Sequence, residues 1–230
     1  MSFPTTRWSV VLGAKPSEPA SGEALRELCA AYWRPLYAFL RRQGLSQEDA
    51  EDAVQGFLAS LLSGSGVGGA DQDRGRFRSY LLGALRNYLS NERAKARALK
   101  RGGSQVPLSI DAQDGELLQV PDLDTPEQAY AYAWAMEILD RTRARLAHSY
   151  TAQGKAELFA TLEPYLGGDA PPYKEVASAL GISEAHARVN THRLRTAFGK
   201  ALREEVAQTV ADEADVDDEL RAVIAATALG

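Results

Sequence analysis

The chain has 230 residues, of which 45% are hydrophobic and 25% are charged, and its formal net charge is −5. This composition is typical of a globular protein and excludes a wholly disordered chain. No apolar run approaches the roughly 18 residues that a membrane span needs, and the first residues lack the apolar core of a secretory signal. We therefore expect a cytoplasmic protein with no membrane partner, folded as one large domain or two small ones.

The first half of the chain predicts helices. Apolar residues with helical spacing cover 25–40, and Pro35 predicts a kink or a break among them. Ser46 is a candidate N-cap for a second helix, because Asp49 stands at the third helical position as a variant of the capping box. A third helix is expected over about 75–99.

The second half is also helical in pattern. Thr125, followed by Pro126 and an acid, is a typical helix start, and a short helix is expected over 155–166. Residues 173–195 have the layout of a helix-turn-helix, in which Gly181 permits a left-handed turn and Ser183 caps the second helix. No run has the alternating pattern of a strand, so the sequence predicts an all-α fold.

We divide the chain into two small helical domains joined by an acidic linker, with an extension at each end. The linker has two prolines and weak periodicity. The five parts are 1–22 (N-terminal extension), 23–103 (first domain), 104–125 (linker), 126–203 (domain with the helix-turn-helix) and 204–230 (acidic, amphipathic C-terminal extension).

Basic residues are concentrated in two stretches, although the chain as a whole is acidic. Residues 74–101 contain nine Lys and Arg residues with Glu92 as the single acid, and 188–203 contain no acid at all. Each stretch alone could be a solvated helix face. Two such stretches in an acidic protein indicate phosphate binding, because that binding needs local rather than total positive charge.

The second basic stretch overlaps the predicted helix-turn-helix. Its outer face would carry polar and basic side chains near a helix N-terminus, an arrangement that suits base edges in the DNA major groove. These residues are His186, Arg188, Val189, Asn190 and Arg193. The alternative is a helical hairpin with a purely structural role.

Two interpretations of the C-terminal extension remain open. It could pack on a basic DNA-binding face and inhibit it, or it could be a further helix that completes the core.

Signals for an enzyme are weak. The glycine-rich segment 64–69 matches a dinucleotide-binding fingerprint, but it follows no strand and has no acid about 20 residues further on. Cys29 lies on an apolar stripe, as a buried structural cysteine does, and a single cysteine argues against a disulfide or a cysteine-based zinc site. We expect no enzyme, no metal and no cofactor.

Three stretches, in this order, resemble the extracytoplasmic-function class of bacterial sigma factors, within the sigma-70 family. The first is Asp49-Ala-Glu-Asp-Ala-Val-Gln-Gly-Phe-Leu58. The second contains Phe77, then Leu81-Leu-Gly-Ala-Leu-Arg-Asn87, and then a basic tail to Arg97. The third is the helix-turn-helix with His192-Arg193.

The sequence departs from the family pattern at Ser90-Asn91 and at Ala185-His186-Ala187, so the promoter preference cannot be carried over from the family.

The resemblance implies a factor that binds core RNA polymerase and directs it to promoter DNA through domains like sigma regions 2 and 4. The polymerase-binding residues would be Asp49, Asp52, Gln55, Phe57 and Leu58, where Phe57 and Leu58 supply either apolar contact or core. The −10 element would be bound by Arg78, Arg86, Asn87, Asn91, Arg93, Lys95 and Arg97. The −35 element would be bound by Ser183, His186, Arg188, Val189, Asn190, Arg193 and Arg195.

The resemblance further implies a monomer when polymerase is absent, and it allows an anti-sigma factor or another regulatory protein as a partner. The alternative function is a stand-alone helix-turn-helix regulator of transcription that does not bind polymerase.

Overall fold

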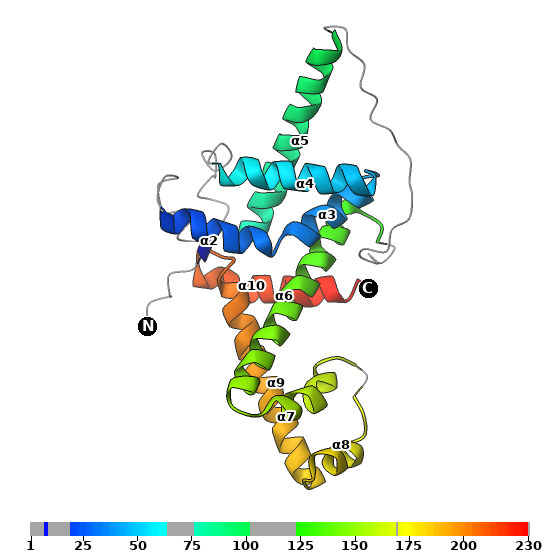
Figure 1. Cartoon of the computed structure of the whole chain (residues 1–230), viewed down its shortest axis with the longest axis vertical. Coiled ribbons are helices and arrows are strands. Elements are labelled where there is room, and N and C mark those ends of the chain that lie inside the picture. The colour runs from blue at the N-terminus through cyan, green and yellow to red at the C-terminus, as the bar shows by residue number, and fades with distance from the viewer. Residues whose placement is uncertain (1–6, 9–18, 64–75, 102–122, 169, 230) are drawn as a thin grey trace. The chain divides into compact units, whose positions relative to one another are not determined.

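The structure, a computed structural model, describes residues 7–8, 19–63, 76–101, 123–168 and 170–229. Within these ranges the regular elements are helices, and the one strand-like pairing is an isolated antiparallel bridge between Arg76 and Val210 (Figure 1). The predicted all-α class is therefore confirmed for the part of the chain that the structure describes. The glycine-rich segment 64–69 and residues 104–122 of the predicted linker lie outside it.

The regular elements of the described residues are helices and 3₁₀ turns, numbered in chain order. They are α2 (Pro19–Ala30), α3 (Trp33–Arg42), α4 (Gln47–Leu62), α5 (Phe77–Arg101), α6 (Pro126–Ala152), α7 (Ala156–Leu162), the 3₁₀ turn η2 (Glu163–Leu166), α8 (Tyr173–Leu180), α9 (Glu184–Ala207), the 3₁₀ turn η3 (Glu213–Asp215) and α10 (Val216–Thr227).

The chain divides into two compact units. Unit 1 combines Met1–Glu137 with Ala207–Gly230, and unit 2 is Ile138–Val206. These bounds differ from the predicted ones, because the first turns of α6 bury Ala129, Tyr130 and Trp134 in unit 1 rather than in the second domain. Of the segment 204–230, which we treated as a separate C-terminal extension, residues 207–230 belong to unit 1 and 204–206 to unit 2.

Local sequence signals set several helix ends as expected. The chain breaks between α2 and α3, and Pro35 stands in the first turn of α3, where its ring would clash with a helix running through it. The Ser46 side chain accepts a hydrogen bond from the Asp49 amide at 3.1 Å, and its hydroxyl donates to the Asp49 carboxylate at 2.8 Å. Thr125 caps α6 by accepting from the Gln128 amide at 3.1 Å.

Aromatic residues form the centre of unit 1. Trp8, Tyr32 and Phe77 are fully buried, and the Phe77 ring lies 5.0 Å from Trp8 and 4.9 Å from Tyr32 between centroids. Trp134, also fully buried, donates its indole N–H to the Tyr32 hydroxyl at 3.0 Å. Phe77 is the first residue of α5, so this cluster fixes the start of that helix.

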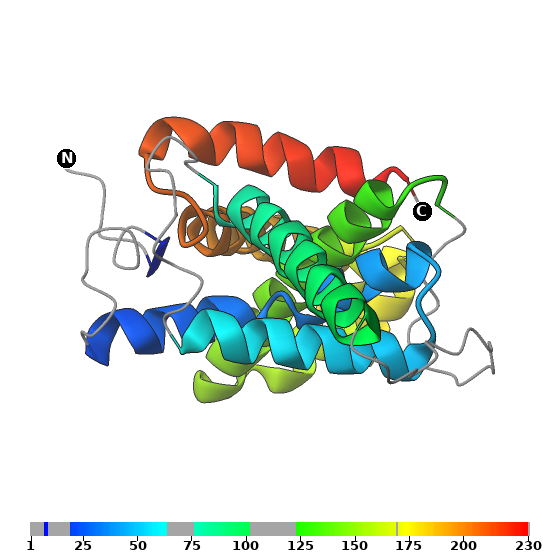
Figure 2. The same cartoon turned by 90° about the horizontal axis from the view of Figure 1, so that it is seen from above.

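The last helix of the chain packs in unit 1. Helix α10 buries Val216, Val223 and Ala226, and Figure 2 shows α5 between α10 and the layer of α2 and α4. The Phe77 amide donates to the Thr209 carbonyl at 2.9 Å, which ties the start of α5 to the segment before α10. Of the two interpretations of the C-terminal extension, these contacts favour the helix that completes the core.

Unit 2 has its own apolar core, formed by the second half of α6, α7, α8 and α9. Its buried members are Leu146, Phe159, Leu162, Tyr165, Val176, Ala177, Ala187, Leu194 and Ala201. The short helix predicted over 155–166 is an α-helix to Leu162 and a 3₁₀ turn after it, where Pro164 stands.

A tight turn joins α8 to α9. Gly181 ends α8 with φ +62° and ψ +31°, the left-handed conformation that its sequence position predicted. The Ile182 amide donates to the Ala177 carbonyl at 3.0 Å, and Ile182 packs on the unit 2 core. Ser183 accepts from the His186 amide at 3.2 Å and so caps α9.

We expect Gly181→Ala to lower the free energy of unfolding by about 1–2 kcal/mol, because an L-residue is strained in the left-handed region. Gly199→Ala is the matched control, since Gly199 lies inside α9 with open space around it and alanine favours helix there by about 0.5–1 kcal/mol. Chemical denaturation followed by circular dichroism measures both, and a stabilising Gly181→Ala would contradict the assigned turn.

Candidate nucleic-acid interface

Helix α5 carries two neighbouring rows of polar side chains beyond its buried first turns. Arg86, Arg93 and Arg97 recur at helical spacing along one row, and Asn87, Asn91 and Lys95 follow at i, i+4 and i+8 along the next. All six are exposed. In Figure 1 the C-terminal part of α5 extends beyond the other helices of unit 1, so both rows are accessible from solvent.

The cations of these rows differ in what they contact. Arg93 and Arg97 form no ion pair with another described residue, whereas Lys95 donates to Glu92 at 2.8 Å, one turn before it. Arg86 pairs with Glu127 at the start of α6, and its guanidinium lies 5.6 Å from the Phe39 ring centroid. The side chains of that pair are about half exposed, so it contributes little to stability and is screened by salt.

Arg78 lies apart from both rows and is held inside unit 1. Its Nε donates to Glu219 Oε1 at 2.6 Å, and its guanidinium lies 5.0 Å from the Trp134 ring centroid. Its side chain is 21% exposed, and Glu219 is completely buried. Among the described contacts of the residues predicted for the −10 element, Arg78 is therefore the one that is paired with a fully buried carboxylate.

A second arginine shares the same buried carboxylate. Arg76 Nε lies 3.6 Å from Glu219 Oε2, an oxygen that accepts no hydrogen bond. Its Nη2 atom lies 3.6 Å from Asp215 Oδ1 and 3.3 Å from Asp218 Oδ2. The acidic start of α10 thus binds the two arginines that flank Phe77.

The acidic surface predicted on α4 consists of fewer residues than expected. Asp52 and Gln55 are exposed and form no hydrogen bond or ion pair with another described residue, but Asp49 is bonded to Ser46 in the helix cap. Phe57 is 3% exposed, and its ring centroid lies 5.7 Å from that of Tyr88. Of the two roles left open for Phe57, apolar contact with a partner or part of the core, this burial fits the core. Leu58 is half-buried.

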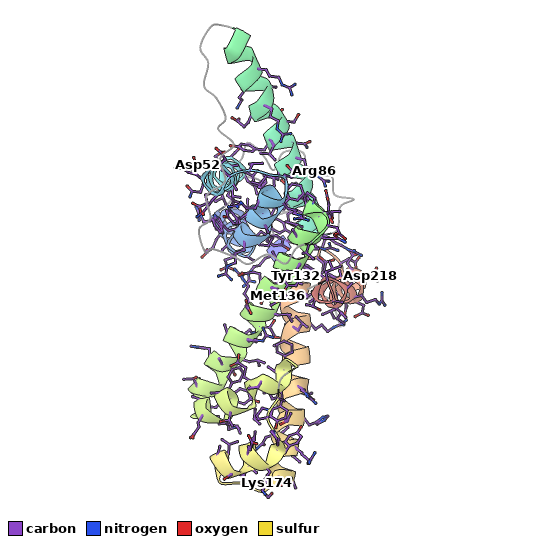
Figure 3. The ribbon with its side chains drawn as sticks, turned by 90° about the vertical axis from the view of Figure 1, so that its right-hand side faces the viewer. Asp52, Arg86, Tyr132, Met136, Lys174 and Asp218 are labelled. Atoms are coloured by element: carbon purple, nitrogen blue, oxygen red, sulfur yellow. The ribbon has the colours of Figure 1, made fainter. Side chains whose placement is uncertain are left out.

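Helices α4 and α5 approach each other closely at this point. A Cβ added at Gly56 would lie 2.6 Å from the Tyr88 hydroxyl, so glycine makes room for that ring. Figure 3 places Asp52 on α4 and Arg86 on α5 on different sides of unit 1.

Helix α9 turns one face away from the unit 2 core. Ala187, Thr191 and Leu194 are buried, and the opposite face exposes His186, Val189 and Arg193. Val189 is a 44% exposed apolar residue among polar ones, and Asn190 lies at the border of the face, half-buried. Ser183 is exposed and is used by the helix cap.

Two predicted arginines of α9 contact their own unit. Arg195 Nε donates to the Tyr165 carbonyl at 3.2 Å, and the Arg188 guanidinium lies 4.4 Å from the Tyr173 ring centroid. Both side chains are still exposed. The sequence of residues 188–203 contains no acid. In the folded unit most of the cations in this stretch still face solvent.

Three exposed polar residues adjoin the predicted surface and were not in the predicted set. They are Lys174 at the start of α8, visible at the end of that helix in Figure 3, and His192 and Lys200 on α9. The helical period of α9 places His192 and Lys200 beside Val189 and Arg193, so the sequence did contain that signal. Lys174 follows only from the fold of α8 against α9.

The described residues offer little other chemistry. Cys29 is buried, and burial raises the pKa of its thiol to about 12, so the nucleophilic thiolate is disfavoured. No cluster of three His, Cys, Asp or Glu side chains that could hold a metal occurs in the part of the chain that the structure describes. None of the described helices combines the length and the apolarity needed to cross a bilayer.

Comparison with known proteins gives no relative. A scan against protein-family models found no match, and searches of curated proteins and of solved structures found no significant match.

We expect Glu219→Gln to lower the free energy of unfolding by about 1.5–3 kcal/mol, the range for hydrogen bonds to charged groups, because two guanidinium groups would lose their buried counter-charge. The control Asp218→Asn removes an exposed acid from the same Arg76 and should cost less than about 1 kcal/mol. If chemical denaturation gives equal losses of unfolding free energy for the two variants, burial of the Glu219 carboxylate does not determine its contribution to stability.

Proposed function

We propose that the protein is a sigma factor of the extracytoplasmic-function type, which binds core RNA polymerase and directs it to promoters through −10 and −35 contacts. The observation that carries the proposal is a pair of exposed cationic helix surfaces, on α5 and on α9, in a chain of net charge −5. Among the described residues, Arg93 and Arg97 of α5 and Arg193 of α9 form no ion pair with a carboxylate. In this proposal the two units act as the two domains, and the protein works in the cytoplasm with polymerase.

The rows on α5 suit a strand of opened DNA. Arg93 and Arg97, with Arg86 when it leaves Glu127, would bind phosphates, and the amides of Asn87 and Asn91 can hydrogen-bond to the edges of unstacked bases. Taking a base out of the stack costs a few kcal/mol. Contacts with polymerase must offset that cost, so we expect the factor alone to bind the −10 element weakly.

The α8–turn–α9 segment suits duplex DNA, as a helix-turn-helix does. Its second helix would enter the major groove with residues near its N-terminus: His186 and Arg193 as hydrogen-bonding partners of bases, and Val189 as an apolar contact for a thymine methyl group. The exposed Lys174 on α8 would contact phosphate, as first helices of this motif do.

The exposed residues of α4 suit a basic partner surface. Asp52 and Gln55 supply an acidic and polar edge that no neighbouring cation occupies among the described residues. Surface ion pairs contribute roughly 0–1 kcal/mol each, so affinity for polymerase would have to come from a wide interface.

The second candidate, a stand-alone helix-turn-helix regulator, is favoured by the α9 surface alone. It leaves the α4 edge and the α5 rows without a role. Transcription by core polymerase, with and without the protein, on a pool of templates with randomised upstream sequence separates the two. We expect start sites that depend on the protein and share two short upstream elements; duplex binding without such start sites would favour the regulator.

We expect Asp52→Arg to weaken capture of core polymerase by about tenfold or more, because like charges facing each other in an interface cost several kcal/mol. Thermal unfolding should be unchanged, since Asp52 is exposed and has no described partner. Asp140→Arg makes the same charge change at an exposed position of α6 and should leave capture unaffected. Equal capture by both variants in a pull-down assay would remove α4 from the interface.

A further inference from the structure

Tyr173 contacts two residues of unit 2 that come from different elements. Its ring stacks on that of Tyr165, with centroids 4.8 Å apart and planes inclined by 22°. The Arg188 Cζ atom lies 4.4 Å from the centroid of the Tyr173 ring, well inside the roughly 6 Å limit for a cation–π contact. A ladder of two aromatic rings and one guanidinium therefore links η2, α8 and α9.

The ladder is fixed at its inner end. Tyr165 is buried, its hydroxyl donates to the Pro171 carbonyl, and its own carbonyl accepts from Arg195 Nε. Tyr165 is thereby bonded both to the segment before α8 and to α9. The Tyr173 ring that rests on it provides Arg188 with a rigid platform.

The contact with the ring leaves the hydrogen-bonding capacity of Arg188 intact. A guanidinium that lies over a ring uses its π face, while its five N–H donors point outward in its plane. The Arg188 side chain is 62% exposed, and Glu184 Oε2 is 3.8 Å away, too far for a hydrogen bond. The donors can still meet O6 and N7 of a guanine, the pair that arginine reads in the major groove.

We infer that Tyr173 is a positioning residue for Arg188: it orders the guanidinium before DNA arrives and so sharpens base discrimination. An arginine that is ordered in advance loses less side-chain entropy on binding. The inference rests on the proposed DNA-reading function of α9 and adds a residue outside the DNA-contacting face.

The test uses the full chain and two DNA probes. One is the duplex that the wild-type protein enriches most from a pool of randomised duplexes, and the other is a scrambled duplex of the same composition. We expect Tyr173→Leu to lower the ratio of the two affinities about two- to fivefold, the size of an exposed cation–π contact, and Tyr173→Phe to retain it. In an Arg188→Ala background, Tyr173→Leu should have no further effect on that ratio.

A ring analogue separates electrostatics from folding. Pentafluorophenylalanine at position 173 keeps the shape of Phe but reverses the ring quadrupole. It should therefore lower the ratio of the two DNA affinities as Tyr173→Leu does, while its thermal unfolding midpoint equals that of Tyr173→Phe. A ratio equal to that of Tyr173→Phe overturns the inference. If Tyr173→Leu still lowers the affinity ratio in the Arg188→Ala background, the inference is also overturned, because the role of Tyr173 would then be structural.

The remaining outcomes distinguish the inference from the proposed function. If the wild-type protein enriches no sequence, DNA reading by α9 fails and the inference fails with it. If it enriches a sequence and Tyr173→Leu leaves the ratio unchanged, the proposed function stands and only the positioning role is overturned. An unchanged ratio in Arg188→Ala overturns the positioning role as well.

Discussion

A buried carboxylate holds the start of α5, the helix that carries the first of the two basic surfaces. Glu219 of α10 is completely buried and faces both Arg76 and Arg78, which flank the first residue of α5. A charge without contact with water is tolerated only when it is paired, so α10 and α5 must be placed together. The aromatic cluster around Phe77 fixes the same turn, and from there α5 runs on past the other helices of unit 1 (Figure 1).

Arginine thus has two different uses along one helix. At positions 76 and 78 it is a structural ion-pair partner, and on Arg78 the planar group also rests on Trp134. At positions 93 and 97 it is exposed and has no described carboxylate partner. The six residues between Arg86 and Arg93 separate the last arginine of α5 that contacts another described helix from the exposed arginines beyond it.

The sequence predicted best what local rules decide. The break before Pro35, the cap at Ser46 and the left-handed Gly181 each depend on a few adjacent residues, and each is found as expected. Such local rules do not predict contacts between residues that are far apart in the sequence. Arg78 and Glu219 are 141 positions apart, and no pattern in either segment indicates the other.

The same reason explains the unit boundaries and the contact between Tyr173 and Arg188. Helix α6 starts where its cap predicted, yet only tertiary packing decides which of its turns join unit 1. Tyr173 has no sequence signal that links it to Arg188, because their contact exists only after α8 folds back on α9.

The discontinuity of unit 1 has a consequence for folding during synthesis. Unit 2 is one continuous stretch, Ile138–Val206, whereas unit 1 includes residues 207–230, which leave the ribosome after all of unit 2. Domains fold as units while the chain is made, at about 5–20 residues per second. Unit 2 can therefore complete its core first, while the nascent unit 1 still has two arginines at the start of α5 that await their counter-ion.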